Sequence, residues 1–325
     1  MKSARKIGLF GFGTVGKGFY ENLKKHPHLP VSIEKVCVKR LDLPRIGHEL
    51  YFTDNPDELL SDPELDIIIE LIDDAEAAKY YVEKTLLAGK DVISANKKMI
   101  GESLQDVDNW HQSFGSHFLY EAAVGGGIPI VHSVDGFLRD QEVKEIRGIL
   151  NGSSNYILTQ MQANQWDFNK ALIDAQYKGF AERDPSLDVS GIDASYKLAI
   201  LAYHAFGEIL SMKSFEIESI ESVTKENIKK AKSKGRKIKS VATLKKTDHE
   251  IICSVKPESV SPNDELYAVD FENNAVSVET LISGRHVFVG KGAGSLPTGS
   301  AVLEDLKRLL DGYSYQVSKR ARTVA

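Results

Sequence analysis

The stretch KIGLFGFGTVGKGFY, residues 6–20, decides the fold of this chain. An apolar run, residues 6–10, reads as a short buried strand, and it enters a glycine-rich turn that leads into a helix ending near Lys25. In Gly11-x-Gly13-x-x-Gly16 the first glycine makes the tight turn, the second lets a pyrophosphate approach the backbone, and the third lets the helix pack on the strand. The free N–H groups of the helix would face the phosphates. Since strand, turn and helix come in the required order, the stretch predicts a dinucleotide site formed by Gly11, Phe12, Gly13, Thr14, Val15 and Gly16.

The rest of the first half alternates strands with helices. Residues 66–72 (DIIIELI) are almost all apolar, as expected of a central parallel strand that is covered on both faces. We expect further strands at 31–38, 51–52, 91–94 and 117–121, and helices at 55–61, 76–88 and 105–114. This alternation predicts a Rossmann-type, doubly wound α/β domain over residues 1–132.

The pattern changes after about residue 132, where helices come first and strands are grouped later. We expect helices at 128–138, 155–163, 167–178, 191–206 and 224–233, and strands at 142–150, 236–246, 249–256, 266–271, 274–281 and 285–290. This grouping predicts an α+β domain with an open sheet over residues 133–298. A last helix is expected at about 299–311.

Composition excludes several classes of protein. The 41 basic residues are outnumbered by 46 acidic ones, so there is no overall basic surface for nucleic acid or membrane lipid. The Lys-rich segment 225–246 reads as a solvated helix face. We find neither a signal peptide nor an apolar stretch of the roughly 18 residues that could span a bilayer. Cys37 and Cys253 lie in apolar runs and read as buried, inert thiols, which suits a cytoplasmic protein.

The end of the second strand bears on the choice of cofactor. An acidic residue at this position usually binds the ribose hydroxyls of NAD. Here the strand ends Val38-Lys39-Arg40, and two cations favour a 2′-phosphate. The sequence therefore predicts a preference for NADP, with NAD as the alternative.

The most informative candidates for catalysis lie on the helix at 191–206. This helix is almost wholly apolar, so it is expected to be buried, yet it carries Asp193, Lys197 and His204. Asp193 and Lys197 are four residues apart and can form an ion pair. A buried lysine needs a partner or a purpose, so either a structural ion pair or a catalytic amine is consistent with the pattern. His204 reads as a core or interface histidine.

Other candidates lie in loops. Glu182, Asp184 and Asp188 precede the same helix and could bind a substrate ammonium group, although helix capping or solvation is the default for Asp184; Ser190 or Asp188 could cap the helix. Lys97 follows an apolar strand at the edge where open α/β sheets bind ligands. Of Lys97 and Lys98, one is expected to be only solvated.

Six ordered blocks show that the chain resembles homoserine dehydrogenases from end to end. They are GFGTVGKG (11–18), SANKK (94–98), YEAAVGGGIPI (120–130), GILNGSSNYIL (148–158), GFAERDPSLDVSGIDASYK (179–197) and GKGAGSLPTGSAV (290–302). Six such blocks are more specific than one glycine motif. The chain departs from the family at Ser153-Ser154, where Thr is common, and at Asp73-Asp74, where glycines are common.

The resemblance implies an NAD(P)-dependent enzyme that interconverts L-homoserine and L-aspartate 4-semialdehyde in threonine and methionine biosynthesis. Lys197 would exchange the proton with the substrate oxygen, and Lys97 would be a second lysine at that oxygen. Glu182 would bind the amino group, and Asp188 and Asp193 would organise the substrate and Lys197. Gly294 would close over the nucleotide.

The resemblance also implies an assembly and a bound ion. Glu121, Val124, Gly126 and Ile128 would hold a monovalent cation, Na⁺ or K⁺, mostly through backbone oxygens. The C-terminal segment 299–325 would return to the cofactor domain, and the late strands would pair with those of a second subunit in a homodimer. Family members often carry a regulatory module or an aspartate kinase fusion; because this chain ends soon after the last block, we expect no allosteric threonine site.

Two rival interpretations remain at this stage. One is a Rossmann dehydrogenase for another amino-alcohol or semialdehyde, which an assay with homoserine would separate. The other is a nucleotide-binding sensor or structural protein that kept the fold and lost catalysis. Loss of Lys97 or Lys197 would favour the sensor, and both lysines are present.

Overall fold

The computed structural model describes residues 4–317, and the chain divides into two compact units. Unit 1 runs to Gly127 and resumes at Ala293, whereas unit 2 is Ile128–Gly292. The chain passes from unit 1 to unit 2 after Gly127 and back to unit 1 after Gly292. Both boundaries come a few residues before those expected from the sequence, 132/133 and 298/299. The assignment of cofactor and substrate binding to separate domains remains a prediction.

Unit 1 is built on a parallel sheet of six strands with the order β3-β2-β1-β4-β5-β6. The order reverses between β1 and β4, and this switch point is where doubly wound sheets leave a crevice for a ligand. The predicted Rossmann-type fold is thereby confirmed. The strands are β1 (Arg5–Phe10), β2 (Val31–Cys37), β3 (Tyr51–Thr53), β4 (Ile67–Glu70), β5 (Asp91–Ser94) and β6 (Phe118–Leu119).

One long helix of unit 1 begins and ends at residues that the local chemistry favours. The Asp74 side chain caps α3 (Ala75–Leu87) by accepting from the backbone N–H of Ala77, and Gly89 stops the helix with a φ of +76°. The other elements are α1 (Thr14–Lys24), α2 (Asp57–Leu60), α4 (Lys97–Glu102), α5 (Leu104–Ser113), the 3₁₀ turn η1 (Glu121–Ala123) and α12 (Ser295–Leu310). The start of α4 at Lys97 was not expected.

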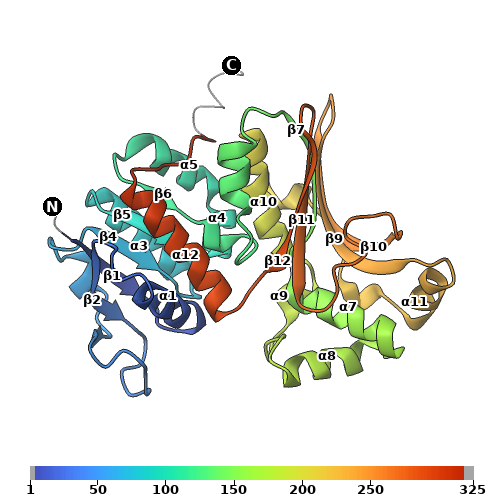
Figure 1. Ribbon diagram of the computed structural model, residues 1–325, viewed down its shortest axis with the longest axis horizontal. Coiled ribbons are helices and arrows are strands. Elements are labelled where there is room, and N and C mark those ends of the chain that lie inside the picture. Colours follow the sequence, from blue (N-terminus) through green and yellow to red (C-terminus); the bar gives the residue numbers. More distant parts are fainter. Residues whose placement is uncertain (1–3, 318–325) are drawn as a thin grey trace. The chain divides into compact units, whose positions relative to one another are not determined.

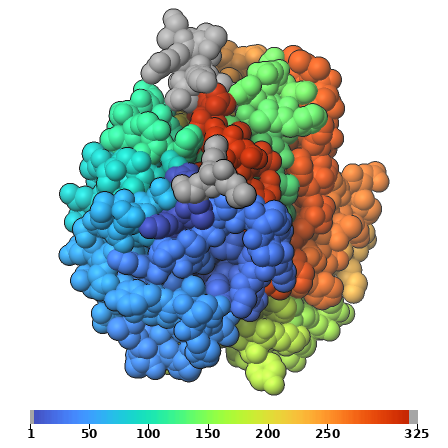
Figure 2. Space-filling view, turned by 60° about the vertical axis from the view of Figure 1, so that its left-hand side comes forward, coloured from blue at the N-terminus to red at the C-terminus, as the bar shows by residue number. Residues whose placement is uncertain are grey.

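The last helix, α12, packs against the first, α1. It begins at Ser295, four residues before the expected start, and the two helices lie side by side in Figure 1. Figure 2 shows the red surface of this C-terminal segment next to the blue surface of the N-terminal residues of the same unit. The described part of the C-terminal segment therefore belongs to unit 1, which also contains the glycine turn; residues 318–325 lie outside the described residues.

Unit 2 contains a mixed sheet with the order β12-β11-β7-β9-β10-β8. Neighbouring strands are antiparallel except β8 and β10, which are parallel. The strands are β7 (Val143–Ile149), β8 (Glu216–Ile217), β9 (Lys237–Lys246), β10 (Ile251–Val260), β11 (Asn273–Thr280) and β12 (Gly284–Lys291). The strand expected at 266–271 is wrong: the backbone turns there, and the Asp264 carboxylate accepts from the N–H of Leu266.

Three helices of unit 2 pack on this sheet (Figure 1): α7 (Gly152–Asn164), α10 (Ile192–Phe206) and α11 (Lys225–Lys232). The other helical segments of the unit are α6 (Ile130–His132), the π-helical turn η2 (Ser133–Phe137), α8 (Phe168–Tyr177), which packs on α7, α9 (Ser186–Val189) and the 3₁₀ turns η3 (Met212–Ser214) and η4 (Ile220–Ser222). Among residues 4–317, no helix is long and apolar enough to cross a membrane.

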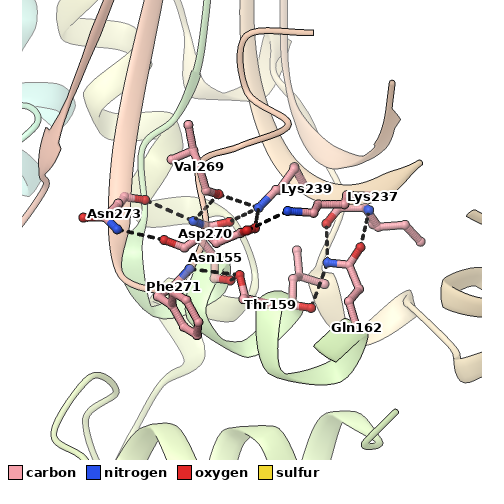
Figure 3. A network of polar contacts seen from close by, with 11 residues as sticks. Asn155, Thr159, Gln162, Lys237, Lys239, Val269, Asp270, Phe271 and Asn273 are labelled. Atoms are coloured by element: carbon pink, nitrogen blue, oxygen red, sulfur yellow. Dashed lines mark hydrogen bonds and ion pairs between the residues drawn. The ribbon is translucent and has the colours of Figure 1, made fainter. Parts of the chain in front are cut away.

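A buried polar cluster joins α7 to β9 and to the turn before β11. The Lys239 ammonium is fully buried and donates to the carbonyl of Val269, to an Asp270 carboxylate oxygen at 2.8 Å and to the side-chain oxygen of Asn155 at 3.3 Å (Figure 3). Lys237 binds the other Asp270 oxygen at 2.6 Å. Every donor has a partner here, so the segment 266–271 is held without forming a strand.

Candidate active site

The glycine turn of unit 1 has the geometry that dinucleotide binding requires. Gly11 has a φ of +89°, and a Cβ there would come within 2.6 Å of the Leu71 carbonyl oxygen. A Cβ on Gly16 would lie 2.4 Å from the Gly11 carbonyl oxygen. At Gly13, by contrast, a Cβ would have no neighbour within 4 Å, so the backbone is open to close approach. The three glycines therefore fit their expected roles of turn, ligand approach and helix packing.

The helix that follows the turn offers its N–H groups to an anion. Gly13 is the N-cap residue of α1 and provides no side-chain cap, so Thr14, Val15 and Gly16 begin the helix without one. The ring of Phe12 is buried against Tyr20 and Phe52, so only the Phe12 backbone is available to a ligand. These residues fit a nicotinamide dinucleotide, whose pyrophosphate they would hold.

Lys39 and Arg40 follow β2 and are exposed. The Lys39 ammonium lies 3.7 Å from an Asp73 carboxylate oxygen and 3.9 Å from one of Asp74. Its side chain is 72% exposed, so both pairs are weak. The two aspartates that depart from the family pattern are thus beside the cation expected to bind a 2′-phosphate. The Arg40 carbonyl accepts from the guanidinium of Arg45.

Lys97 is the first residue of α4. The Asn96 side-chain oxygen caps this helix by accepting from the N–H of Met99 at 3.0 Å. Lys97 is half-buried and Lys98 is exposed. The structure thus selects Lys98 as the solvated member of the pair and Lys97 as the candidate.

The second group of candidates is in unit 2 and centres on Lys197. This side chain is buried within α10, and its ammonium lies 2.7 Å from an Asp193 carboxylate oxygen and 2.6 Å from the Leu150 carbonyl oxygen. The expected i, i+4 ion pair is confirmed. An amine held by two acceptors still has its third N–H direction for another oxygen atom.

Asn151 joins the carboxylates of this group, and sequence reasoning missed it. Its side-chain N–H₂ donates to Asp188 at 2.7 Å and to Asp193 at 2.8 Å. Its side-chain oxygen accepts from the N–H of Ser154 and so caps α7. An Asn between a predicted strand and a predicted helix was the available signal, because this is the N-cap position.

Only part of the loop before α10 contacts the residues around Lys197. Asp188 is half-buried and bound to Asn151, whereas Glu182 is exposed, and its backbone carbonyl accepts from Gln176. Asp184 accepts from the N–H of Ser186, which is the default expected for it. The N-cap residue of α10 is neither Ser190 nor Asp188 but Gly191, whose φ of +88° favours glycine. The Ser190 hydroxyl nevertheless accepts from the N–H of Ile192, the first residue of the helix, at 3.4 Å.

His204 has the surroundings expected of a core histidine, whereas the role of Gly294 in covering the nucleotide remains a prediction. His204 is fully buried in α10, with its ring 3.4 Å from an Asp135 carboxylate oxygen, as a core histidine. Gly294 is the N-cap of α12 with a φ of +117°, and the hydroxyl of the next residue, Ser295, donates to the carbonyl of Thr14 at 2.7 Å. Gly294 is thus close in the fold to the glycine turn.

The residues expected to hold a cation lie around the end of unit 1. Glu121 is buried at the start of η1, and Gly125 and Gly126 both have positive φ, at +75° and +56°. Ile128 is the first residue of unit 2. Among the described residues no cluster of three or more His, Cys, Asp or Glu could hold a metal ion, so a cation here would depend on backbone oxygens.

The sheet order and the glycine turn define the class: a dinucleotide-binding protein with a Rossmann-type domain. A family model described as "Homoserine dehydrogenase, NAD binding domain" matches residues 11–121, and one described as "Homoserine dehydrogenase" matches residues 129–306. The chain belongs to the homoserine dehydrogenase family.

Individual relatives agree with this membership. The homoserine dehydrogenase of Lactococcus lactis is 34% identical over 94% of this chain and 74% of its own length, and that of Helicobacter pylori is 36% identical over 94% and 74%. A homoserine dehydrogenase structure from Thiobacillus denitrificans matches with a TM-score of 0.90 and 33% identity, over 98% of this chain and 74% of that one. A hyperthermophilic archaeal homoserine dehydrogenase in complex with NADPH matches with a TM-score of 0.83 at 25% identity, over 96% and 99%.

Proposed function

We propose that this chain catalyses the NAD(P)-dependent interconversion of L-homoserine and L-aspartate 4-semialdehyde. The observation that carries the proposal is the buried Lys197 amine, held by Asp193 and Leu150 and linked through Asn151 to Asp188, in a chain of this family. The test is oxidation of homoserine followed by the absorbance of the reduced nicotinamide, with both cofactors. Turnover of another amino-alcohol but not of homoserine would favour the rival dehydrogenase, and no turnover of either would contradict an enzyme.

The proposed roles follow from the chemistry of alcohol oxidation, in which a hydride and a proton leave the substrate. The nicotinamide, when bound, supplies the hydride chemistry. The neutral amine of Lys197 accepts the hydroxyl proton, and the ammonium so formed donates it to the aldehyde oxygen in the reverse direction. Asp193 and the Leu150 carbonyl orient the amine, and Lys97 provides a second ammonium for the same oxygen. Gly294 closes over the nucleotide.

Glu182 is proposed to bind the substrate ammonium, and this gives a testable prediction. Glu182→Gln removes a charge from an exposed side chain, so KM for homoserine is expected to rise about tenfold or more, while kcat changes little. Steady-state kinetics with varied homoserine measure both. Asp184→Asn, in the same loop, is the matched control and should leave KM unchanged; equal effects of the two substitutions would show that Glu182 has no specific role.

The proposed preference for NADP rests on Lys39 and Arg40. Charge-assisted contacts to a phosphate contribute roughly 1.5–3 kcal/mol, so Lys39→Ala is expected to lower kcat/KM with NADP about tenfold to a hundredfold and to leave that with NAD nearly unchanged. Asp73→Asn should act slightly in the opposite direction, because it removes one of the two weak ion pairs of the Lys39 ammonium. Wild-type kcat/KM that is equal or higher with NAD would contradict the preference.

A homodimer is proposed on the basis of the edge strand β12. Alternate side chains of this strand, Val287 and Val289, are exposed, as are Leu281 and Ile282 in the turn that precedes it. An exposed apolar edge is a ready surface for pairing with a second chain. Light scattering should give twice the chain mass, and Val289→Lys should reduce it to one chain mass; a monomeric wild type would overturn the proposal.

Two further assignments complete the proposal. A monovalent cation, Na⁺ or K⁺, would be held by Glu121, Val124, Gly126 and Ile128, and the positive φ of Gly125 and Gly126 gives the tight backbone turn that such a site needs. A cytoplasmic location is supported by the thiols of Cys37 and Cys253, which are free and buried; burial raises the pKa of each to about 11, so neither is a reactive thiolate.

A further inference from the structure

The carboxyl ends of β4 and β5 are joined by a closed ring of four hydrogen bonds around a buried carboxyl group. One oxygen of Glu70, the last residue of β4, accepts from the Ser94 hydroxyl at 2.5 Å, and the other accepts from the N–H of Ile72 at 2.7 Å. The Ser94 oxygen accepts from the N–H of Asn96 at 3.1 Å, and the Asn96 amide donates to the Ile72 carbonyl at 3.1 Å. Both strand ends are thereby fixed to each other by side chains.

The ring lies between the glycine turn and the start of α4. On one side, the Asn96 oxygen caps α4, whose first residue is Lys97. On the other side, the Leu71 carbonyl, between Glu70 and Ile72, is the atom that leaves no room for a Cβ at Gly11. Displacement of the ring would move both features.

Burying the Glu70 carboxyl at this position costs free energy. It is fully buried and follows three isoleucines, so an apolar residue would be the ordinary choice for the strand. Burial raises the pKa of Glu70 to about 7, although the Ser94 hydroxyl and the Ile72 N–H act in the opposite direction. A buried carboxyl is tolerated only when its hydrogen bonds are satisfied, and perturbed groups gather at functional sites.

We propose that Glu70 is a positioning residue for the dehydrogenase reaction: through Ser94 and Asn96 its buried carboxyl fixes the start of α4 and so the placement of Lys97. The proposal rests on the proposed function and on the role of Lys97 in it. Glu70 acts through its ring partners and not on the substrate. The isosteric Glu70→Gln places an N–H₂ donor or a neutral oxygen where the carboxylate accepts two hydrogen bonds, so one bond of the ring is lost or weakened.

The kinetic test is a double-mutant cycle on homoserine oxidation. Glu70→Gln is expected to lower kcat about tenfold to a hundredfold, because a small misplacement of a catalytic group is costly, with KM for homoserine within about twofold. In a Lys97→Met background the same substitution should lower kcat by less than about twofold, since the group that it positions is gone. If the double variant loses kcat by the product of the two single losses, Glu70 has a merely structural role and the proposal is overturned. A wild-type kcat in Glu70→Gln would also overturn it.

A second measurement does not depend on activity and separates failure of this proposal from failure of the proposed function. Amide hydrogen exchange of the peptide that covers residues 95–102 should accelerate at least tenfold in Glu70→Gln and in Ser94→Ala, which keeps the carboxyl but removes the two ring bonds that the Ser94 hydroxyl makes. Thr85→Val, which removes another buried hydroxyl of unit 1, should leave this peptide unchanged. Unchanged exchange in both ring variants overturns the proposal, whatever the substrate proves to be.

Discussion

Replacing Lys197 by methionine is expected to lower kcat for homoserine oxidation by about 10² to 10⁴, the usual contribution of a general acid or base. Methionine keeps the volume and the apolar stem but removes the amine that Asp193 and the Leu150 carbonyl hold at 2.7 and 2.6 Å. The glycine turn belongs to unit 1 and Lys197 to unit 2, so the dissociation constant for the nucleotide, measured by fluorescence titration, should change little.

Loss of stability has to be separated from loss of chemistry, because removing one member of a buried ion pair leaves the other charge uncompensated. The chain offers a matched control in another buried lysine, Lys239, which also pairs with an aspartate, Asp270, and with a backbone carbonyl (Figure 3). Burial lowers the pKa of Lys239, and Asp270 opposes this shift. Lys239→Met should lower Tm as much as Lys197→Met or more, yet leave kcat of the folded enzyme within about twofold. Near-wild-type turnover in Lys197→Met, or equal losses of kcat in both variants, would rule out the proton-transfer role.

The features that the sequence predicted well are those that depend on neighbours along the chain. The glycine turn, the apolar run that became β4 and the ion pair of Asp193 and Lys197 all follow from spacing of a few residues, and the structure has all three. The same local reasoning predicted a strand at 266–271 that does not exist. Its apolar residues are buried against other parts of unit 2, and Lys239 and Asn155, both distant in the sequence, hold the backbone there in a turn.

The features that were missed depend on pairs of residues that are far apart in the sequence. Asn151 lies 37 and 42 residues from the two carboxylates that it binds, and Glu70 lies 24 residues from Ser94. Asn151 lies in a block shared with the family and at an N-cap position, whereas Glu70 lies in no such block; in neither case does local periodicity show which distant side chains the residue binds. Glu70 is the last residue of β4, a strand that its apolar pattern predicted correctly. The pattern predicted the strand, and only the register of β4 against β5 shows what its last residue does.

The crossing of α1 and α12 is the second place where a single substitution is expected to have a large effect. A Cβ on Gly18 would come within 1.9 Å of the Ser295 carbonyl oxygen, and one on Gly299 within 2.3 Å of the Gly18 carbonyl carbon. Both obstacles are backbone atoms, which cannot move aside as a side chain can. The two glycines therefore let the helices approach more closely than any other residue would allow, and they tie the C-terminal segment to the helix that follows the glycine turn.

Gly299→Ala is expected to destabilise unit 1 by about 3 kcal/mol, the upper end of the usual cost of overpacking, or to prevent its folding. The direction of the change in unfolding free energy decides the test, because alanine in a helix interior is ordinarily about 1 kcal/mol more favourable than glycine. Gly115→Ala is the control: a Cβ there would have no neighbour within 4 Å, so stability should be unchanged or slightly higher. Urea unfolding followed by circular dichroism measures both variants. If Gly299→Ala is as stable as the wild type, the two helices can separate at little cost and the prediction is wrong. In that case only weaker nucleotide binding by the folded variant would still show that the close contact of the helices supports the glycine turn.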